Sequence, residues 1–150
     1  MRTVTLQDYK RRLLRVLVHI QQHLDDALGL QELAGLACFS PYHFHRIFKG
    51  MVGESVKEHI RRLRLERAAS QLKLGTAPVT RIAFDAGYES PEAFTRSFRA
   101  VFGASPSQFR SSNKSKMTTA APSGLHSRDG KAVRAFQNHS TWRQEHERED

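Results

Sequence analysis

Apolar and polar residues along the first 112 positions follow the spacing of amphipathic helices. Apolar residues recur at steps of three and four, which is the period of one helix face. In the first long helix this apolar face consists of Leu6, Tyr9, Leu13, Val16, Leu17, Ile20 and Leu24. No segment shows the strict alternation of a half-buried strand. The pattern therefore predicts an all-α fold.

Serine, proline and glycine mark where the predicted helices begin and end. A Ser-Pro pair supplies an N-cap and a proline at the first helical position, and the chain has three of them, at Ser40-Pro41, Ser90-Pro91 and Ser105-Pro106. The expected helix ends are Gly50 with Gly53, Gly75 and Gly103. Two short helices are expected between these, one with Leu30, Leu33, Ala34 and Ala37 and one with Val79, Ile82, Ala83 and Ala86. A last turn is expected from Pro106 through Phe109.

A long basic helix is predicted from Ser55 to Gly75. Its inward positions are expected to be Val56, Ile60, Leu63 and Leu72. Its four arginines, Arg61, Arg62, Arg64 and Arg67, are expected to point largely outward. We interpret them as a solvated face, some of which could touch phosphate.

The chain contains an internal repeat. Residues 40–55 and 90–105 are identical at seven of sixteen positions, where about one identity is expected by chance. The identical pairs are Ser40/Ser90, Pro41/Pro91, Phe44/Phe94, Arg46/Arg96, Phe48/Phe98, Gly53/Gly103 and Ser55/Ser105. Each copy is a short helix, a tight turn and a second helix. This predicts two helix-turn-helix subdomains, of homeodomain-like architecture, joined by the long basic helix.

The second helix of each copy has an apolar face and an opposite face that can meet DNA. The residues expected inward are Phe44, Ile47, Phe48 and Met51 in the first copy, and Phe94, Phe98, Val101 and Phe102 in the second. Those expected outward are Tyr42, His45, Arg46 and Lys49 in the first copy, and Glu92, Thr95, Arg96 and Arg99 in the second. A helix fits the major groove, where arginine can bind guanine O6 and N7. The backbone N–H groups at the Ser40 and Ser90 helix starts suit phosphates.

The predicted linker helix has a length that suits two adjacent grooves. About 20 residues span roughly 30 Å, and successive major grooves on one side of B-DNA lie about 34 Å apart. One monomeric chain could therefore read about 20 base pairs. Because the two outward faces differ, that site would be asymmetric.

Composition supports a nucleic-acid partner and separates residues 1–112 from residues 113–150. Lys and Arg outnumber Asp and Glu by 24 to 15, for a net charge of +9 and a pI near 10.3, which favours a polyanionic partner. Residues 113–150 are polar, with few and scattered large apolar residues, so we expect a mostly disordered tail. No apolar run approaches the length of a membrane span and no secretory signal is visible, which predicts a cytoplasmic protein without a membrane partner.

The residues predict no catalytic site, no metal site and no cofactor. The chain lacks a Gly-rich phosphate loop, an HExxH pair, a GxSxG elbow and a Cys-His arrangement. Its single cysteine, Cys38, rules out a multi-thiolate zinc site, and we interpret it as an ordinary buried or half-buried thiol. His19 and His23 have helical spacing but no convincing third ligand, and we interpret them as a solvated pair.

The chain resembles the AraC/XylS family of bacterial transcription regulators. The resemblance is carried by the stretch from Ala83 to Arg110, AFDAGYESPEAFTRSFRAVFGASPSQFR, and extends over about residues 7–112. It implies two helix-turn-helix subdomains that bind double-stranded promoter DNA and usually activate transcription through RNA polymerase. By position, it places the base-reading residues at Tyr42, His45 and Arg46 in the first copy and at Glu92, Ala93 and Arg96 in the second. Backbone contacts are implied for Ser40, Lys49, Ser90, Thr95 and Arg99.

Three departures from the family pattern bear on function. Many relatives read bases through amide or hydroxyl side chains at the tip of the second recognition helix, where this chain has Pro91, Glu92 and Ala93. Glu92 either accepts from cytosine N4 or serves the helix N-terminus without touching a base. Cys38 stands where the second copy has Gly87, so the first turn either avoids positive φ or is strained. No sensor domain is evident, which predicts a stand-alone or shortened regulator.

Two other functions remain open at this point. The chain could be a shortened paralogue that acts by contact with RNA polymerase or a relative, using the tail. It could also bind nucleic acid by charge alone, which predicts equal affinity for any duplex. The outward faces of the two repeat helices favour sequence-specific regulation.

Overall fold

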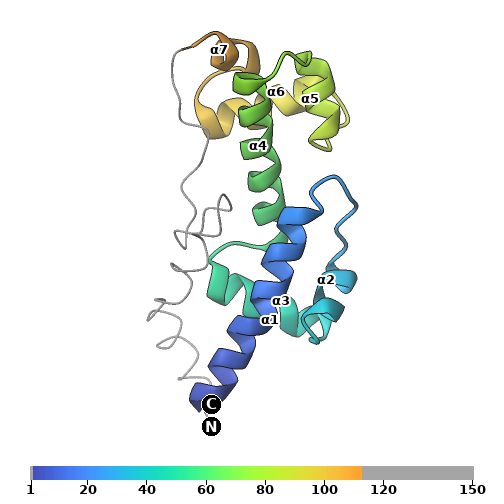
Figure 1. The fold of residues 1–150 in the computed structure, drawn as a ribbon, viewed down its shortest axis with the longest axis vertical. Helices are drawn as coiled ribbons and strands as arrows, with labels where there is room; N and C mark the ends of the chain where they lie inside the picture. Colours follow the sequence, from blue (N-terminus) through green and yellow to red (C-terminus); the bar gives the residue numbers. More distant parts are fainter. Residues whose placement is uncertain (1, 113–150) are drawn as a thin grey trace. The chain divides into compact units, whose positions relative to one another are not determined.

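The computed structural model describes residues 2–112, and all regular structure in this part of the chain is helical (Figure 1). The helices are α1 (Arg2–Gln22), α2 (Leu30–Leu36), α3 (Pro41–Val52), α4 (Val56–Leu74), α5 (Val79–Asp85), α6 (Pro91–Phe102) and α7 (Pro106–Ser111). The predicted all-α class is confirmed. The predicted tail, residues 113–150, lies outside the described residues.

The described residues form two compact units that divide between Ile60 and Arg61, within α4. In the first unit α1 packs on α2, and α2 packs on α3. Its buried side chains come from the apolar faces that the sequence predicts. They include Leu13, Val16 and Ile20 of α1, Leu33 and Ala34 of α2, and Phe44, Ile47, Phe48 and Met51 of α3.

The second unit repeats this arrangement with different surroundings. Helix α5 packs on α6, and α6 packs on α7. Its core includes Leu65, Ala68, Ala69 and Leu72 of α4, Ile82 and Ala83 of α5, Phe94 and Phe98 of α6, and Phe109 of α7. A short helix, a turn and a second helix therefore recur in both units, as the repeat predicts.

Helix starts follow the predicted Ser-Pro pairs. The Oγ atoms of Ser40, Ser90 and Ser105 accept from the backbone N–H three residues on, at 3.1–3.2 Å, and each is followed by proline in the first turn. Gln108 also accepts from the Ser105 N–H at 3.2 Å, which completes a capping box. Ser55 Oγ accepts from the Glu58 N–H at 3.1 Å at the start of α4. Side-chain caps of this kind fix where each helix begins.

Two predicted helix ends were wrong by two residues, and a third was confirmed. Leu24 lies beyond α1, because the chain leaves the helix through a tighter bond from the His23 N–H to the Ile20 carbonyl. Of the two glycines predicted to mark the end of α3, Gly53 caps it with a φ of 88°, and Gly50 lies inside its last turn. The last turn extends past Phe109 to Ser111 as helix α7.

The prediction that Val101 faces inward was wrong. Val101 has 43% of its surface exposed. The ring of Phe109, on α7, lies 5.2 Å from that of Phe98 and 5.4 Å from that of Phe102. Since α7 covers the side of α6 along these two rings, Val101 lies outside the covered side.

Candidate nucleic-acid interface

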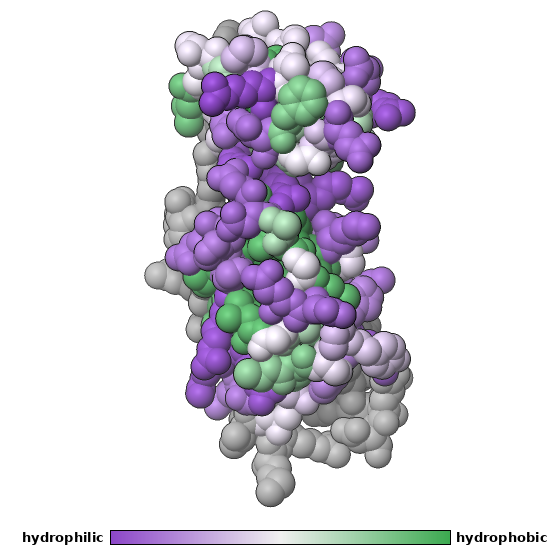
Figure 2. All heavy atoms as spheres, turned by 90° about the vertical axis from the view of Figure 1, so that its right-hand side faces the viewer, coloured by the Kyte–Doolittle hydropathy of each residue, from purple (hydrophilic) through white to green (hydrophobic). Residues whose placement is uncertain are grey.

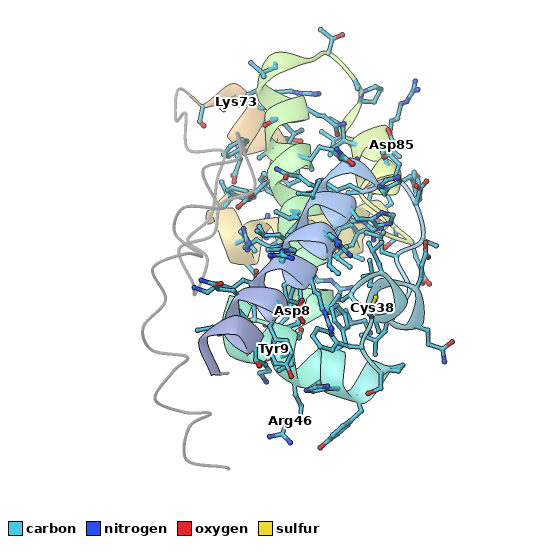
Figure 3. The ribbon with its side chains drawn as sticks, turned by 60° about the horizontal axis from the view of Figure 1, so that its bottom comes forward. Asp8, Tyr9, Cys38, Arg46, Lys73 and Asp85 are labelled. Carbon is cyan, nitrogen blue, oxygen red and sulfur yellow. The ribbon has the colours of Figure 1, made fainter. Side chains whose placement is uncertain are left out.

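Helix α3 buries one face and exposes the other, as expected of a helix that reads DNA. Phe44 and Phe48 are fully buried. The four residues predicted outward, Tyr42, His45, Arg46 and Lys49, are all exposed, and Tyr42 has 74% of its surface accessible. Figure 3 shows the Arg46 side chain directed away from the ribbon. The sequence-predicted residues of the first copy therefore share one surface.

Helix α6 has the same division of faces, with a smaller exposed surface near its start. Phe94 and Phe98 are fully buried, whereas Glu92, Arg96 and Arg99 are exposed. Ala93 and Thr95 are half-buried. Glu92, Arg96 and Arg99 thus share the exposed face of α6, together with the half-buried Ala93 and Thr95. Both α3 and α6 carry an exposed arginine at the same repeat position.

The two predicted backbone-contacting serines serve as helix caps. Ser40 Oγ accepts from the His43 N–H at 3.2 Å, and Ser90 Oγ accepts from the Ala93 N–H at 3.1 Å. The N–H groups of the first turn that these caps leave over can still bind an anion. A hydroxyl that accepts in a cap keeps its own hydrogen available to donate. Capping and a phosphate contact are therefore compatible at both serines.

The turn before α3 has a left-handed residue that is not glycine. Cys38 has a φ of 59°, and no other non-glycine residue of the described chain has positive φ. The neighbouring Phe39 N–H donates to the Ala34 carbonyl at 2.9 Å, which closes the turn. Of the two alternatives that the sequence left open, the structure shows the strained one. The expectation of a buried or half-buried thiol was wrong, because Cys38 is exposed.

An aromatic cluster supports this first turn, and sequence reasoning missed it. The ring of Phe39 lies 5.2 Å from that of Tyr9, on α1, and 5.1 Å from that of His43, on α3. The guanidinium carbon of Arg12 lies 4.9 Å from the Phe39 ring centre. Arg12 also pairs with Asp8 at 3.1 Å. The apolar periodicity placed Tyr9 on the inward face, but it carried no signal for which rings would meet.

Two arginines of α4 lie against the second turn, where Gly87 has a φ of 88°. Arg67 donates from Nη2 to the Asp85 carbonyl at 3.2 Å. A Cβ atom added to Gly87 would lie 3.3 Å from Arg64 Nη1. Glycine adopts this backbone region at little cost. The interpretation of Arg64 and Arg67 as a solvated face was wrong, since both are half-buried against this turn.

Two buried polar pairs lie at and near the start of α4. Arg62 is only 8% exposed and donates to Glu66 at 3.0 Å, so its predicted outward position was wrong. Pairing with a carboxylate one turn on is what allows the guanidinium to be buried. Nδ1 of His59 lies 2.8 Å from Glu54 Oε1, also buried. Of the four predicted outward arginines, Arg61 alone is exposed.

Helix α7 is joined to the end of α4 by side chains that the sequence analysis did not single out. Arg110 donates from Nε to the Leu72 carbonyl at 3.0 Å and from Nη2 to the Ala77 carbonyl at 2.6 Å. The Lys73 ammonium lies 5.0 Å from the Phe109 ring centre and donates to the Ser112 carbonyl. A cation at a helix C-terminus bonds carbonyls that lack helical partners.

The His19–His23 pair forms a stacked contact where α1 ends, with His19 in its last turn and His23 just beyond it. The ring centres lie 4.1 Å apart, and His23 Nδ1 lies 2.8 Å from the His19 carbonyl oxygen, to which it donates. Among residues 2–112 no group of three or more His, Cys, Asp or Glu side chains is placed to hold a metal ion.

In the same part of the chain no helix combines the length and apolar character of a membrane span. Figure 2 shows hydrophilic side chains over much of the visible face.

Comparison with known proteins identifies the family. A helix-turn-helix domain family of the AraC type matches residues 33–112. The transcriptional regulator Rob of Salmonella typhimurium is 33% identical over 99 residues, which cover 66% of this chain and 34% of Rob. The chain thus spans about a third of that relative's length. The HTH-type transcriptional activator AarP of Providencia stuartii is 34% identical, over 65% of this chain and 73% of AarP.

A solved structure supports the same assignment. The DNA-binding domain of AdpA, a global transcriptional factor solved with a target DNA, superimposes with a TM-score of 0.60. It is 28% identical, and the match covers 65% of this chain and 88% of the AdpA domain. The relatives are DNA-binding transcription regulators and not enzymes. The chain therefore belongs to the AraC/XylS family of helix-turn-helix transcription regulators.

Proposed function

We propose that this chain regulates transcription by inserting α3 and α6 into adjacent major grooves of one asymmetric promoter site. The observation that carries this proposal is the matched pair of helices. Both have 12 residues, both begin with a capped Ser-Pro pair, and both expose an arginine at the same repeat position, Arg46 and Arg96. The exposed residues around these arginines differ between the two helices, which favours two different base sequences.

The proposed roles follow from side-chain chemistry. Arg46 and Arg96 can bind guanine O6 and N7 with two hydrogen bonds, and Tyr42 and His45 can donate to or accept from neighbouring base edges. Glu92 can accept from cytosine N4, and Ala93 can contact a thymine methyl group. Lys49, Thr95 and Arg99, together with the helix starts at Ser40 and Ser90, are assigned to phosphates, which set register without reading sequence.

The length of α4 supports a site of two adjacent grooves. Its 19 residues correspond to about 28 Å of helix, which is close to the roughly 34 Å between successive major grooves on one side of the duplex. In this proposal residues 1–112 form the DNA-binding domain and act as a monomer. Because AarP is a transcriptional activator, we propose activation, with RNA polymerase as a partner.

Selection of bound duplexes from a random library tests this function. The full 150-residue chain is incubated with the library at physiological salt, and bound duplexes are sequenced after several rounds. We expect an asymmetric motif of two short blocks about one helical turn apart. Uniform, salt-sensitive binding without enrichment would contradict the proposal and favour a nonspecific binder or a regulator that works through another protein.

A further inference from the structure

Two arginines of α4 lie at the turn that leads into α6, and one of them is hydrogen-bonded to it. Arg67 Nη2 donates to the carbonyl oxygen of Asp85, the last residue of α5, at 3.2 Å. The last carbonyls of a helix have no helical partner, and a cation near them is favourable. One turn earlier on α4, Arg64 Nη1 lies 3.3 Å from where a Gly87 Cβ would be.

This turn is short, so it sets the direction of α6. Only Tyr88 and Glu89 separate Gly87 from the N-cap Ser90. The Gly87 N–H donates to the Phe84 carbonyl at 3.0 Å, and the Tyr88 N–H donates to the Ala83 carbonyl at 3.2 Å. A shift at Asp85 or Gly87 would therefore be passed to the first turn of α6. Recognition through bidentate contacts needs placement to within about 0.5 Å.

The turn into α3 is supported by other chemistry. There the left-handed residue is Cys38, and the support is the ring cluster of Tyr9, Phe39 and His43. The two halves of the repeat thus share a turn with a left-handed residue. The first turn is contacted by α1 and the second by α4.

We propose that Arg64 and Arg67 are positioning residues that hold α6 in its reading orientation and do not read bases themselves. This inference rests on the proposed function, since it takes α6 to read one block of the site. It assigns to α4 a role in base preference at that block only.

The main test compares Arg67→Ala with Arg61→Ala. Both variants remove one positive charge from α4, but Arg61 is exposed, and the contacts at the turn come from Arg64 and Arg67. Each variant is taken through the duplex selection. We expect Arg67→Ala to lose base preference in the block that Arg96→Ala also relaxes, with about tenfold weaker binding to the wild-type motif. The other block should be unchanged, and Arg61→Ala should keep both blocks.

A second readout does not require DNA. Amide hydrogen exchange at Gly87 and Tyr88 should be faster in Arg67→Ala than in Arg61→Ala, with little change at Cys38 and Phe39. Arg67→Lys keeps the charge and one donor, so it should recover part of the base preference and of the exchange protection.

Three outcomes would overturn the inference. The first is unchanged amide exchange at the turn in Arg67→Ala. The second is that Arg67→Ala weakens binding to the motif and to scrambled DNA equally, and by as much as Arg61→Ala does. The third is that Arg67→Ala loses base preference in both blocks. If the wild-type chain shows no base preference, the proposed function fails. The exchange comparison then still decides whether Arg67 holds the turn.

Discussion

Cys38 and Gly87 occupy the left-handed position of the same turn in the two halves of the repeat. Their φ angles are 59° and 88°. For a residue with a Cβ atom this region costs about 1–2 kcal/mol, whereas glycine enters it freely. The first turn therefore contains a local strain that the second lacks, and the packing of Phe39 against Tyr9 and His43 is what holds it in place.

Substitutions at these two positions should have opposite effects on stability. Cys38→Gly should raise the free energy of unfolding by about 0.5–1 kcal/mol, because relief of the strain exceeds the entropy cost of glycine. Gly87→Ala should lower it by about 1–2 kcal/mol. Denaturant unfolding of the full chain measures both. Gly35→Ala is the matched control. Gly35 lies in α2, and an added Cβ would meet nothing within 4 Å, so this variant should raise the free energy of unfolding slightly. Effects of the same sign at Cys38 and Gly87 would disprove the strain.

Base-reading and phosphate-contacting residues should differ in how their loss depends on DNA sequence. Arg96→Ala should weaken binding to the selected motif by about 1–3 kcal/mol and relax preference at one position. Lys49→Ala should weaken binding to every sequence alike and reduce the salt dependence by about one counterion. Titrations on motif and scrambled duplexes at several salt concentrations separate the two. If Arg96→Ala weakened binding to both duplexes equally, Arg96 would not be a base-reading residue.

At the scale of elements, α4 shows where sequence reasoning succeeds and where it stops. Its start at Ser55 and its end before Gly75 were predicted, because side-chain caps and glycine are local signals. Its faces were predicted only in part. Leu63 and Leu72 are buried as expected, but Arg62 is buried too, because Glu66 pairs with it. Burial of a paired charge depends on tertiary packing, which hydropathy patterns do not report.

The Arg62–Glu66 pair allows a direct test of this burial. Glu66→Leu should destabilise the chain by about 3 kcal/mol, because it removes the carboxylate that the buried Arg62 Nη1 bonds. Replacing both residues with leucine should recover most of that loss. Arg81→Ala is the control, since it breaks an exposed pair with Asp85, at 3.9 Å, and should cost less than about 1 kcal/mol. Equal unfolding midpoints for Glu66→Leu and Arg81→Ala would show that burial of the pair contributes nothing.

The candidate site was predictable because it lies on repeated helices. The outward positions of α3 and α6 follow from the helical spacing of their apolar residues, and both exposed arginines appear where the repeat places them. The supports of the two turns were not predictable. Tyr9 and Arg12 lie far from Phe39 in sequence, and Arg67 is 18 residues from Asp85. Such contacts form only when helices pack, so spacing within a helix does not reveal them.

At the scale of the whole molecule, a net charge of +9 ensures attraction to any duplex. Charge alone carries no sequence information. The proposed specificity comes instead from two helices on one chain that bind at the same time. Linking two binding modules in this way raises overall affinity by about 10²–10⁴ when the geometry lets both engage. The spacing between the two base blocks should therefore matter as much as the blocks themselves.

Insertion of five base pairs between the two blocks of the selected motif tests simultaneous reading most directly. Half a helical turn moves the blocks to opposite faces of the duplex, so one chain with the 19-residue helix α4 could engage only one of them. Equilibrium titration should show affinity about 100-fold weaker than for the intact motif. An unchanged affinity would contradict the proposal that α3 and α6 read one site together.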